Sequence, residues 1–234
     1  MQSFTARVTE IRDLTHDVRQ IDFALRDPPE MTFDAGQFIS FEVERPGYST
    51  RATRPYSIAS PPEHRNTIQL VLNLVPGGPG SGYLFGLREG DNTQFKGPAG
   101  SFTLRDSSRE ALCVVTGTGI APIRSMLWSL AIRGSMRRVR LFWGLRSERD
   151  LYYQEELAVL QKRLPNLSVT TTLSQPTASW RGSIGRVTPL VAATVNDVSA
   201  LEVYLCGNGA MIRDVRDLIR RKGLCPIYTE QYYS

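Results

Sequence analysis

The chain has 234 residues, enough for one large domain or two medium ones, each with its own core. Its 41% hydrophobic and 22% charged residues are typical of a soluble globular protein, and no apolar run is long enough to span a bilayer. The net charge of +5 comes from scattered side chains, without the basic tail or aromatic stripe of a nucleic-acid-binding protein. It favours a solvated surface or the docking of an acidic partner.

Three cysteines, Cys113, Cys206 and Cys225, stand too far apart for a disulfide framework, a zinc site or an iron–sulfur ligand set. His16 and His64 are the only histidines, so we expect no metal site. The first residues contain no apolar signal segment, and we therefore expect a cytoplasmic protein.

Short β-rich runs, separated by turns such as Pro46-Gly47, follow one another up to about residue 104. These runs are residues 4–11, 18–25, 37–44, 54–60 and 67–75. Many short strands at this spacing predict a small antiparallel barrel or sandwich.

Within the fourth run, Arg54-Pro55-Tyr56-Ser57 brings a guanidinium, a ring and a hydroxyl together. Strand alternation sends Arg54 and Tyr56 to one face and Ser57 to the other, and Pro55 favours a sheet edge. An arginine fork matches phosphate oxygens, while a tyrosine face can lie on a planar ring. An ordinary edge strand remains the alternative.

The loop Pro76-Gly77-Gly78-Pro79-Gly80-Ser81-Gly82 precedes a helix-like stretch at 83–87. Backbone N–H groups of such a loop can bind an anion, although a flexible hairpin loop has the same composition.

After a polar linker at 105–110, strands alternate with helices, which predicts a parallel sheet with helices on both faces. The expected strands are 111–116, 139–143, 167–173, 201–206 and 226–229. The expected helices are 122–133, 151–163, a stretch after Pro189, and 210–222. We therefore predict two domains, residues 1–105 and 106–234.

The first of these strands runs into Thr116-Gly117-Thr118-Gly119, followed by Pro122 in a helix opening. Glycines at a strand–helix junction let a backbone approach a dinucleotide pyrophosphate, but a structural tight turn is also consistent with the sequence. The next strand ends near Arg146, Glu148 and Arg149. An acid there suits a ribose hydroxyl and an arginine suits a 2′-phosphate, so NADH and NADPH both stay open.

Together, these stretches resemble the ferredoxin–NADP reductase family, in its oxygenase-reductase and flavin-reductase branch. The resemblance extends from Gly36-Gln37-Phe38 to Glu230 and rests on the order and spacing of six short motifs. These are Arg54-x-Tyr56-Ser57, Gly78-x-Gly80-Ser81, Gly97-Pro98-x-Gly100-x-Phe102, Thr116-Gly117-Thr118-Gly119-x-Ala121-Pro122, Cys206-Gly207 and Glu230-x-Tyr232. It implies an N-terminal antiparallel Greek-key β-barrel that binds FAD and a C-terminal α/β parallel-sheet domain that binds NADPH or NADH.

The resemblance also implies roles for individual residues. Arg54 would bind a flavin phosphate, Tyr56 would stack on the isoalloxazine, and Ser57 would lie near its N5 atom. Gly80 and Ser81 would bind the pyrophosphate through backbone and hydroxyl donors. Cys206 and Glu230 would lie beside the nicotinamide, with Thr118 on the same side; Tyr232 would cover the flavin, although Tyr233 follows and could do so instead. The further cofactor-binding residues that it implies are Pro55, Val71, Asn73, Gly78, Thr116, Gly117, Gly119, Arg146, Tyr152 and Gly207.

We therefore expect an NAD(P)H-dependent flavoprotein that passes electrons to a ferredoxin or another acidic redox protein, such as an oxygenase component. The chain lacks the C-x₄-C-x₂-C run of fused iron–sulfur domains, so we expect the acceptor to be separate. A reductase that releases reduced free flavin is the alternative, and the glycine-rich loop favours tightly bound FAD over it. A non-catalytic basic interaction module is the third possibility.

Overall fold

The structure, a computed structural model, describes residues 1–44 and 50–233, without the side chain of Tyr233. The predicted Pro46-Gly47 turn lies outside the described residues. The contacts divide the chain into two compact units. One comprises Met1–Leu104 with Ala121–Ser129, and the other comprises Arg105–Ile120 with Leu130–Ser234.

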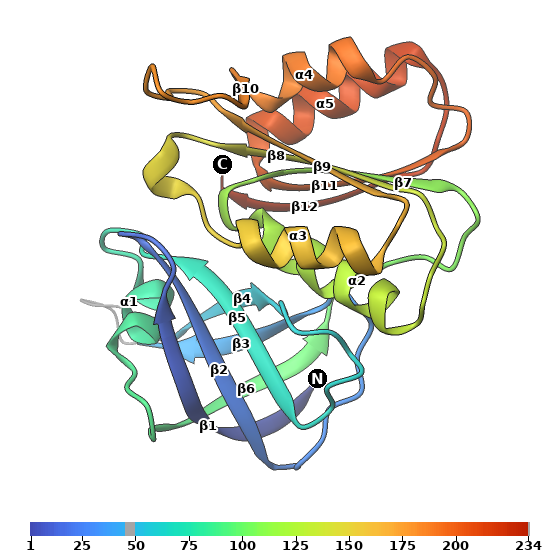
Figure 1. The fold of residues 1–234 in the computed structure, drawn as a ribbon. Helices are drawn as coiled ribbons and strands as arrows, with labels where there is room; N and C mark the ends of the chain where they lie inside the picture. The colour runs from blue at the N-terminus through green and yellow to red at the C-terminus, as the bar shows by residue number, and fades with distance from the viewer. Residues whose placement is uncertain (45–49, 234) are drawn as a thin grey trace. The chain divides into compact units, whose positions relative to one another are not determined.

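The first unit contains a six-stranded antiparallel sheet in the order β4-β3-β6-β1-β2-β5 (Figure 1). Its elements are β1 (Gln2–Asp13), β2 (Val18–Asp27), β3 (Phe38–Val43), β4 (Ala52–Ser57), β5 (Thr67–Asn73), α1 (Pro79–Gly86) and β6 (Asn92–Ala99). The outer strands β4 and β5 meet where Ile58 bridges to Leu70 and the Ala59 N–H donates to the Gln69 carbonyl. The sheet thus curls into the expected barrel.

Alternation along the strands explains the core of this barrel. In β2, for example, Ile21 and Phe23 are buried while Asp22 and Ala24 are only partly so. The inward side chains form one cluster in which Phe41 meets Phe95 at a ring-centroid distance of 5.6 Å. Strand β6 (Asn92–Ala99) lies outside the β-rich runs that the sequence predicted.

The second unit contains a parallel sheet in the order β10-β9-β8-β7-β11-β12, as the alternation of strands and helices predicted. Its strands are β7 (Glu110–Thr116), β8 (Val139–Leu145), β9 (Leu167–Leu173), β10 (Ser183–Ile184), β11 (Leu201–Asn208) and β12 (Ile227–Tyr233). Its helices are α3 (Gln154–Arg163), α4 (Val187–Thr194) and α5 (Gly209–Lys222), with short 3₁₀ turns η1 (Gly117–Gly119) and η2 (Glu148–Asp150). Helix α2 (Ile120–Ile132) has its central residues in the first unit.

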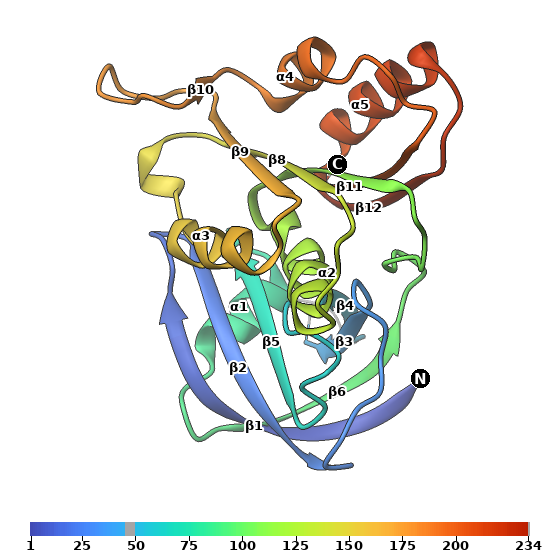
Figure 2. The same cartoon turned by 45° about the vertical axis from the view of Figure 1, so that its right-hand side comes forward.

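Helices α4 and α5 cover one face of the parallel sheet, and α3 lies on the other (Figures 1 and 2). Strands β7 and β11 are almost wholly buried and apolar, as expected for central strands of a parallel sheet. Helix α5 is amphipathic: Val215 and Ile219 face the core, and Asn208 caps its N-terminus through the Ala210 and Met211 N–H groups.

A buried ion pair fixes the start of the second unit. Arg137 and Glu202 lie 2.5 Å apart, with side chains 6% and 5% exposed. Arg137 also donates to the Arg105 and Arg109 carbonyls, while the Tyr204 hydroxyl donates to Glu202 and accepts from the Arg105 N–H. The linker that the sequence predicted at 105–110 is therefore held to this sheet by its backbone.

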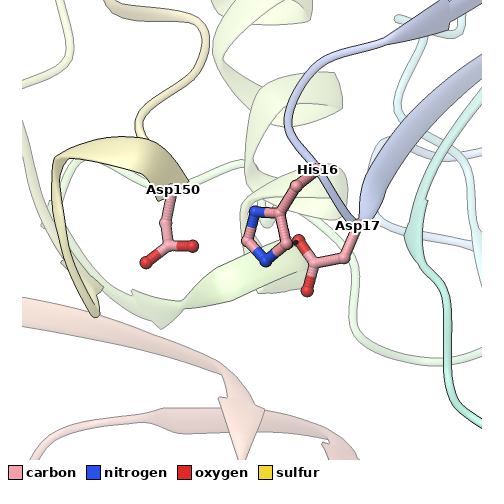
Figure 3. Close-up of side chains that lie close together, drawn as sticks. All are labelled: His16, Asp17 and Asp150. Atoms are coloured by element: carbon pink, nitrogen blue, oxygen red, sulfur yellow. Dashed lines mark ion pairs between the residues drawn. The ribbon is translucent and has the colours of Figure 1, made fainter.

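Other carboxylates stabilise turns of their own unit. In the β1–β2 turn, His16 Nε2 lies 3.6 Å from Asp17 Oδ1 (Figure 3). The same Asp17 oxygen accepts a hydrogen bond from the Thr15 hydroxyl. In η2, Asp150 accepts from the N–H and hydroxyl of Ser147 and completes a capping box. Among residues 1–44 and 50–233, no helix is long and apolar enough to cross a membrane.

Candidate functional site

The Arg54-Pro55-Tyr56-Ser57 motif forms the end of β4, a strand at the edge of the barrel sheet that pairs only with β3 within it. Pro55 therefore replaces an N–H that an inner strand would need for its ladder. Ser57 is 5% exposed, whereas Arg54 and Tyr56 are partly exposed. The Tyr56 ring packs edge-on against Phe41 at 6.0 Å, which leaves it anchored in the core at one edge.

Gly80, in the first turn of α1, lies against this motif. A Cβ at position 80 would stand 2.8 Å from the Arg54 Cγ and would also collide with the Tyr56 hydroxyl. Only a glycine allows this approach. The structure therefore brings together Arg54, Tyr56 and the glycine-rich loop, and both side chains turn to the same side of β4, as strand alternation predicted.

Helix α1 begins with Pro79 after Gly78, which makes no side-chain capping bond. The Ser81 hydroxyl accepts from the Val75 N–H at 3.0 Å and lies within hydrogen-bond distance of the Val75 and Gly78 carbonyls. It therefore helps to fold the loop. The backbone N–H groups of Gly80 and Ser81 have no helical acceptor within the first turn, which is the property that allows the N-terminus of a helix to bind an anion.

The same loop borders a groove of about 910 Å³ in the first unit. Its walls include residues 74–79, Tyr83, Arg51, Glu42 and residues 92–94. The other two expected flavin contacts lie on β5, where Val71 is buried and Asn73 is partly exposed.

In the second unit, two aromatic side chains hold the turn after β7 through hydrogen bonds. Gly117 has φ of 52°, a conformation that suits glycine, and its carbonyl accepts from Trp143 Nε1 at 3.0 Å and from the Tyr152 hydroxyl at 3.1 Å. Tyr152 is only 6% exposed, and its hydroxyl bond to the Gly117 carbonyl helps to hold the turn in place. No local sequence signal marks this role of Trp143, because its contact with Gly117 spans 26 residues.

A second turn, after β11, packs directly on the first. Gly207 has φ of 123°, and a Cβ there would lie 2.7 Å from the Thr116 carbonyl oxygen. The Thr116 hydroxyl accepts from the Asn208 N–H at 2.9 Å, and a Cβ on Gly119 would lie 2.7 Å from the Cys206 carbonyl carbon. The structure thus joins Thr116-Gly117-Thr118-Gly119 and Cys206-Gly207 at the carboxyl ends of two neighbouring strands, where ligands of such sheets bind.

The Cys206 thiol is fully buried, and its backbone pairs with Val115 on one side and Glu230 on the other. Burial raises its pKa well above the usual range, the nearby Glu230 carboxylate raises it further, and the neighbouring Tyr232 side chain opposes the shift. Cys206 is therefore a neutral thiol. The structure thus brings together Cys206, Glu230 and Tyr232, three of the residues expected at the nicotinamide end. The side chain of Tyr233 lies outside the described residues.

At the end of β8, Arg146 is exposed, whereas the Glu148 carboxylate accepts hydrogen bonds from Thr177. Glu148 accepts from the Thr177 hydroxyl at 2.6 Å and the Thr177 N–H at 2.9 Å, and the hydroxyl contact is the largest cause of its lowered pKa. The Gln175 N–H also donates to the Arg146 carbonyl. The loop after β9 is therefore attached to the end of β8.

Comparison with known proteins matches both regions of the chain. Residues 5–104 match the oxidoreductase FAD-binding domain, and residues 113–217 match the oxidoreductase NAD-binding domain. A protein named ferredoxin–NADP reductase B, from Sorangium cellulosum, is 34% identical over 242 residues, covering 99% of this chain and 98% of that protein. The chain belongs to the ferredoxin–NADP reductase family.

Oxygenase reductases of this family are similar over about two thirds of their length. The reductase component of naphthalene 1,2-dioxygenase/salicylate 5-hydroxylase systems of a Ralstonia species is 33% identical, covering 97% of this chain and 68% of that protein. The crystal structure of a cytochrome P450 reductase from Amycolatopsis has a TM-score of 0.89 at 29% identity, covering 100% of this chain and 70% of that one. The resemblance, the two-domain fold and the assignment as an FAD- and NAD(P)-dependent oxidoreductase are thereby confirmed.

Proposed function

We propose that this protein oxidises NAD(P)H through bound FAD and delivers the electrons to a ferredoxin or another redox protein. The observation that carries this proposal is the packing of Gly80 against Arg54 and Tyr56, because it gathers phosphate-binding and ring-binding groups within one unit. We propose residues 1–105 as the FAD-binding domain and 106–234 as the NAD(P)-binding domain.

In the first domain, Arg54 and the backbone N–H groups of Gly80 and Ser81 would hold the flavin pyrophosphate, with Gly78 shaping the loop. Tyr56 would support the isoalloxazine, Pro55 would end the ladder beside it, and Ser57 would lie near N5. Val71 and Asn73 would complete the wall on β5. The groove of about 910 Å³ beside the glycine-rich loop is large enough for the adenosine portion, since small-molecule sites measure roughly 300–1,000 Å³.

In the second domain, the turn from Thr116 to Gly119 would bind the nucleotide pyrophosphate at the N-terminus of α2. Thr118, Gly207 and the Cys206 thiol would line the nicotinamide site. Because Cys206 is neutral, it would contact the nicotinamide as an uncharged group. It would not stabilise, by charge, the positive ring that forms when hydride leaves. Bound FAD would supply the redox chemistry, since a flavin accepts a hydride and releases single electrons.

The partner is proposed from the relatives, whose names include a ferredoxin–NADP reductase and a reductase component of oxygenase systems. A net charge of +5 suits an acidic protein of that kind, because complementary charge speeds encounter. We also propose a cytoplasmic location, since Cys113, Cys206 and Cys225 are free thiols and NAD(P)H is the electron source.

The experiment is to purify the protein, measure its FAD content, and follow NADH and NADPH oxidation with a ferredoxin as acceptor. We expect about one FAD per chain and reduction of ferredoxin without added flavin. A protein that is active only with stoichiometric added flavin would be a flavin reductase. A protein that neither binds FAD nor oxidises either nucleotide would overturn the proposal.

A further inference from the structure

Arg124 is a buried arginine outside the motifs assigned above. It lies in the second turn of α2, within the part of that helix that belongs to the barrel unit, and it is 8% exposed. A guanidinium is costly to bury, so its hydrogen bonds must offset lost hydration. Nη1 donates to the Ala59 carbonyl and to the Gln69 side-chain oxygen, both at 2.8 Å.

These two acceptors lie on the segment that closes the barrel. Ala59 comes two residues after Ser57, and its N–H donates to the Gln69 carbonyl. The Gln69 N–H in turn donates to the Ser60 hydroxyl at 3.2 Å. Arg124 therefore contacts the segment that continues β4 at the point where it meets β5.

A chain of polar side chains orients these acceptors. The Gln69 amide donates to Asp22 at 2.6 Å, and Gln20, which is fully buried, donates to the other Asp22 oxygen at 2.6 Å. Asp22 thus fixes which end of the Gln69 amide faces Arg124, and a carboxylate lies one side chain away from the buried guanidinium.

Two serines of α2 make further hydrogen bonds to the segment that follows β4. The fully buried Ser125 donates to the Ser60 carbonyl at 2.7 Å, and Ser129, one turn further on, donates to Glu63 at 2.8 Å. The contacts of Arg124 and Ser125 lie next to the flavin motif, whereas that of Ser129 lies in the loop beyond it. Ser129 therefore provides a matched control on the same face of the helix.

We propose that Arg124 is a positioning residue: it holds the Ala59–Ser60 backbone to α2 and so fixes where β4 presents Ser57 to the flavin. The inference rests on the proposed function of β4. Because α2 begins directly after the proposed dinucleotide turn, the same helix connects that turn covalently to the contacts that orient the flavin strand. Small displacements of a reacting group can cost ~100-fold in rate, so a shift of β4 will register in hydride transfer.

The test compares Arg124→Met, Arg124→Lys and Ser129→Ala in the full chain. Melting temperature, FAD dissociation constant, visible circular dichroism of bound FAD and the limiting rate of flavin reduction are measured for each. For Arg124→Met we expect altered flavin dichroism and a limiting rate reduced about tenfold at saturating nucleotide, with partial recovery in Arg124→Lys. Ser129→Ala should lower the melting temperature while leaving the dichroism and the rate as in the wild type.

If Arg124→Met is only less stable, with wild-type dichroism and rate, the residue is structural and the inference is wrong. If Arg124→Met does not fold, Arg124→Lys decides in the same way, because it keeps the charge and loses the planar fork. Wild-type protein that fails to bind FAD would refute the proposed function instead.

Discussion

Gly80 lies so close to Arg54 that a Cβ on the glycine would stand 2.8 Å from the arginine Cγ. An alanine at position 80 would push Arg54 and Tyr56 away from the glycine-rich loop, so we expect Gly80→Ala to displace the groups that we propose to bind the flavin phosphates. The dissociation constant of FAD should rise at least about tenfold, equivalent to ~1.4 kcal/mol. Titration of the apoprotein with FAD measures it.

Gly86→Ala is the control in the same helix, because a Cβ there would meet nothing within 4 Å. Alanine favours a helix over glycine by roughly 0.5–1 kcal/mol, so this variant should be as stable as the wild type or more so. Equal FAD affinity in Gly80→Ala and Gly86→Ala would contradict the assignment of the loop.

The sequence left the choice between NADH and NADPH open, because an acid and two arginines follow β8. We expect this choice to depend on which of these side chains can reach the adenosine ribose. Thr177 engages Glu148, while Arg146 is exposed at the end of β8. We expect Arg146→Ala to lower kcat/KM for NADPH about tenfold more than for NADH, because an arginine fork binds a 2′-phosphate. Glu148→Gln should affect both nucleotides alike. A loss confined to NADH in Glu148→Gln would instead place its carboxylate on the ribose.

Local signals explain what the sequence predicted. Pro55 marked β4 as an edge strand, and the glycines after β7 marked a tight turn. The sequence also placed Cys206-Gly207 at the end of a parallel strand, while the structure adds that this strand, β11, is the neighbour of β7. Each of these signals acts within a few residues. The roles of the individual site residues stay predictions.

Contacts distant in sequence explain what was not foreseen. Strand β6 alternates regularly, but its inward positions include Thr93 and Gly97, which carry no apolar signal, and it pairs with β1 about 90 residues away. Arg124 reads as a surface arginine of a helix because its acceptors lie 55 and 65 residues earlier. Burial of polar groups by distant partners leaves no periodic pattern.

The buried pair of Arg137 and Glu202 should matter more for stability than the exposed pairs. Glu202→Leu leaves Arg137 buried without its carboxylate, and we expect it to lower the free energy of unfolding by roughly 3–5 kcal/mol. Tyr204→Phe, which removes the hydroxyl that bonds Glu202 and Arg105, should cost roughly 1–3 kcal/mol. Glu10 forms an exposed ion pair with Arg12, so Glu10→Ala should change the free energy of unfolding by less than about 1 kcal/mol. Urea unfolding of the three variants gives the order, and similar values for Glu202→Leu and Glu10→Ala would contradict it.

Cys113, in the middle of β7, predicts how stability falls at alkaline pH. Burial raises the pKa of its thiol from 9.0 to about 12, with an opposing effect of Arg137. Below pH 9 the thiol is protonated in both folded and unfolded chains. Between pH 9 and 12 the unfolded chain loses this proton while the folded chain keeps it, so the free energy of unfolding falls by about 1.4 kcal/mol per pH unit. Cys113→Ala removes this contribution and leaves every other titrating group in place. Urea unfolding at pH 8 and pH 11 should therefore show a smaller loss in Cys113→Ala than in the wild type, and equal losses would mean that the thiol ionises without unfolding.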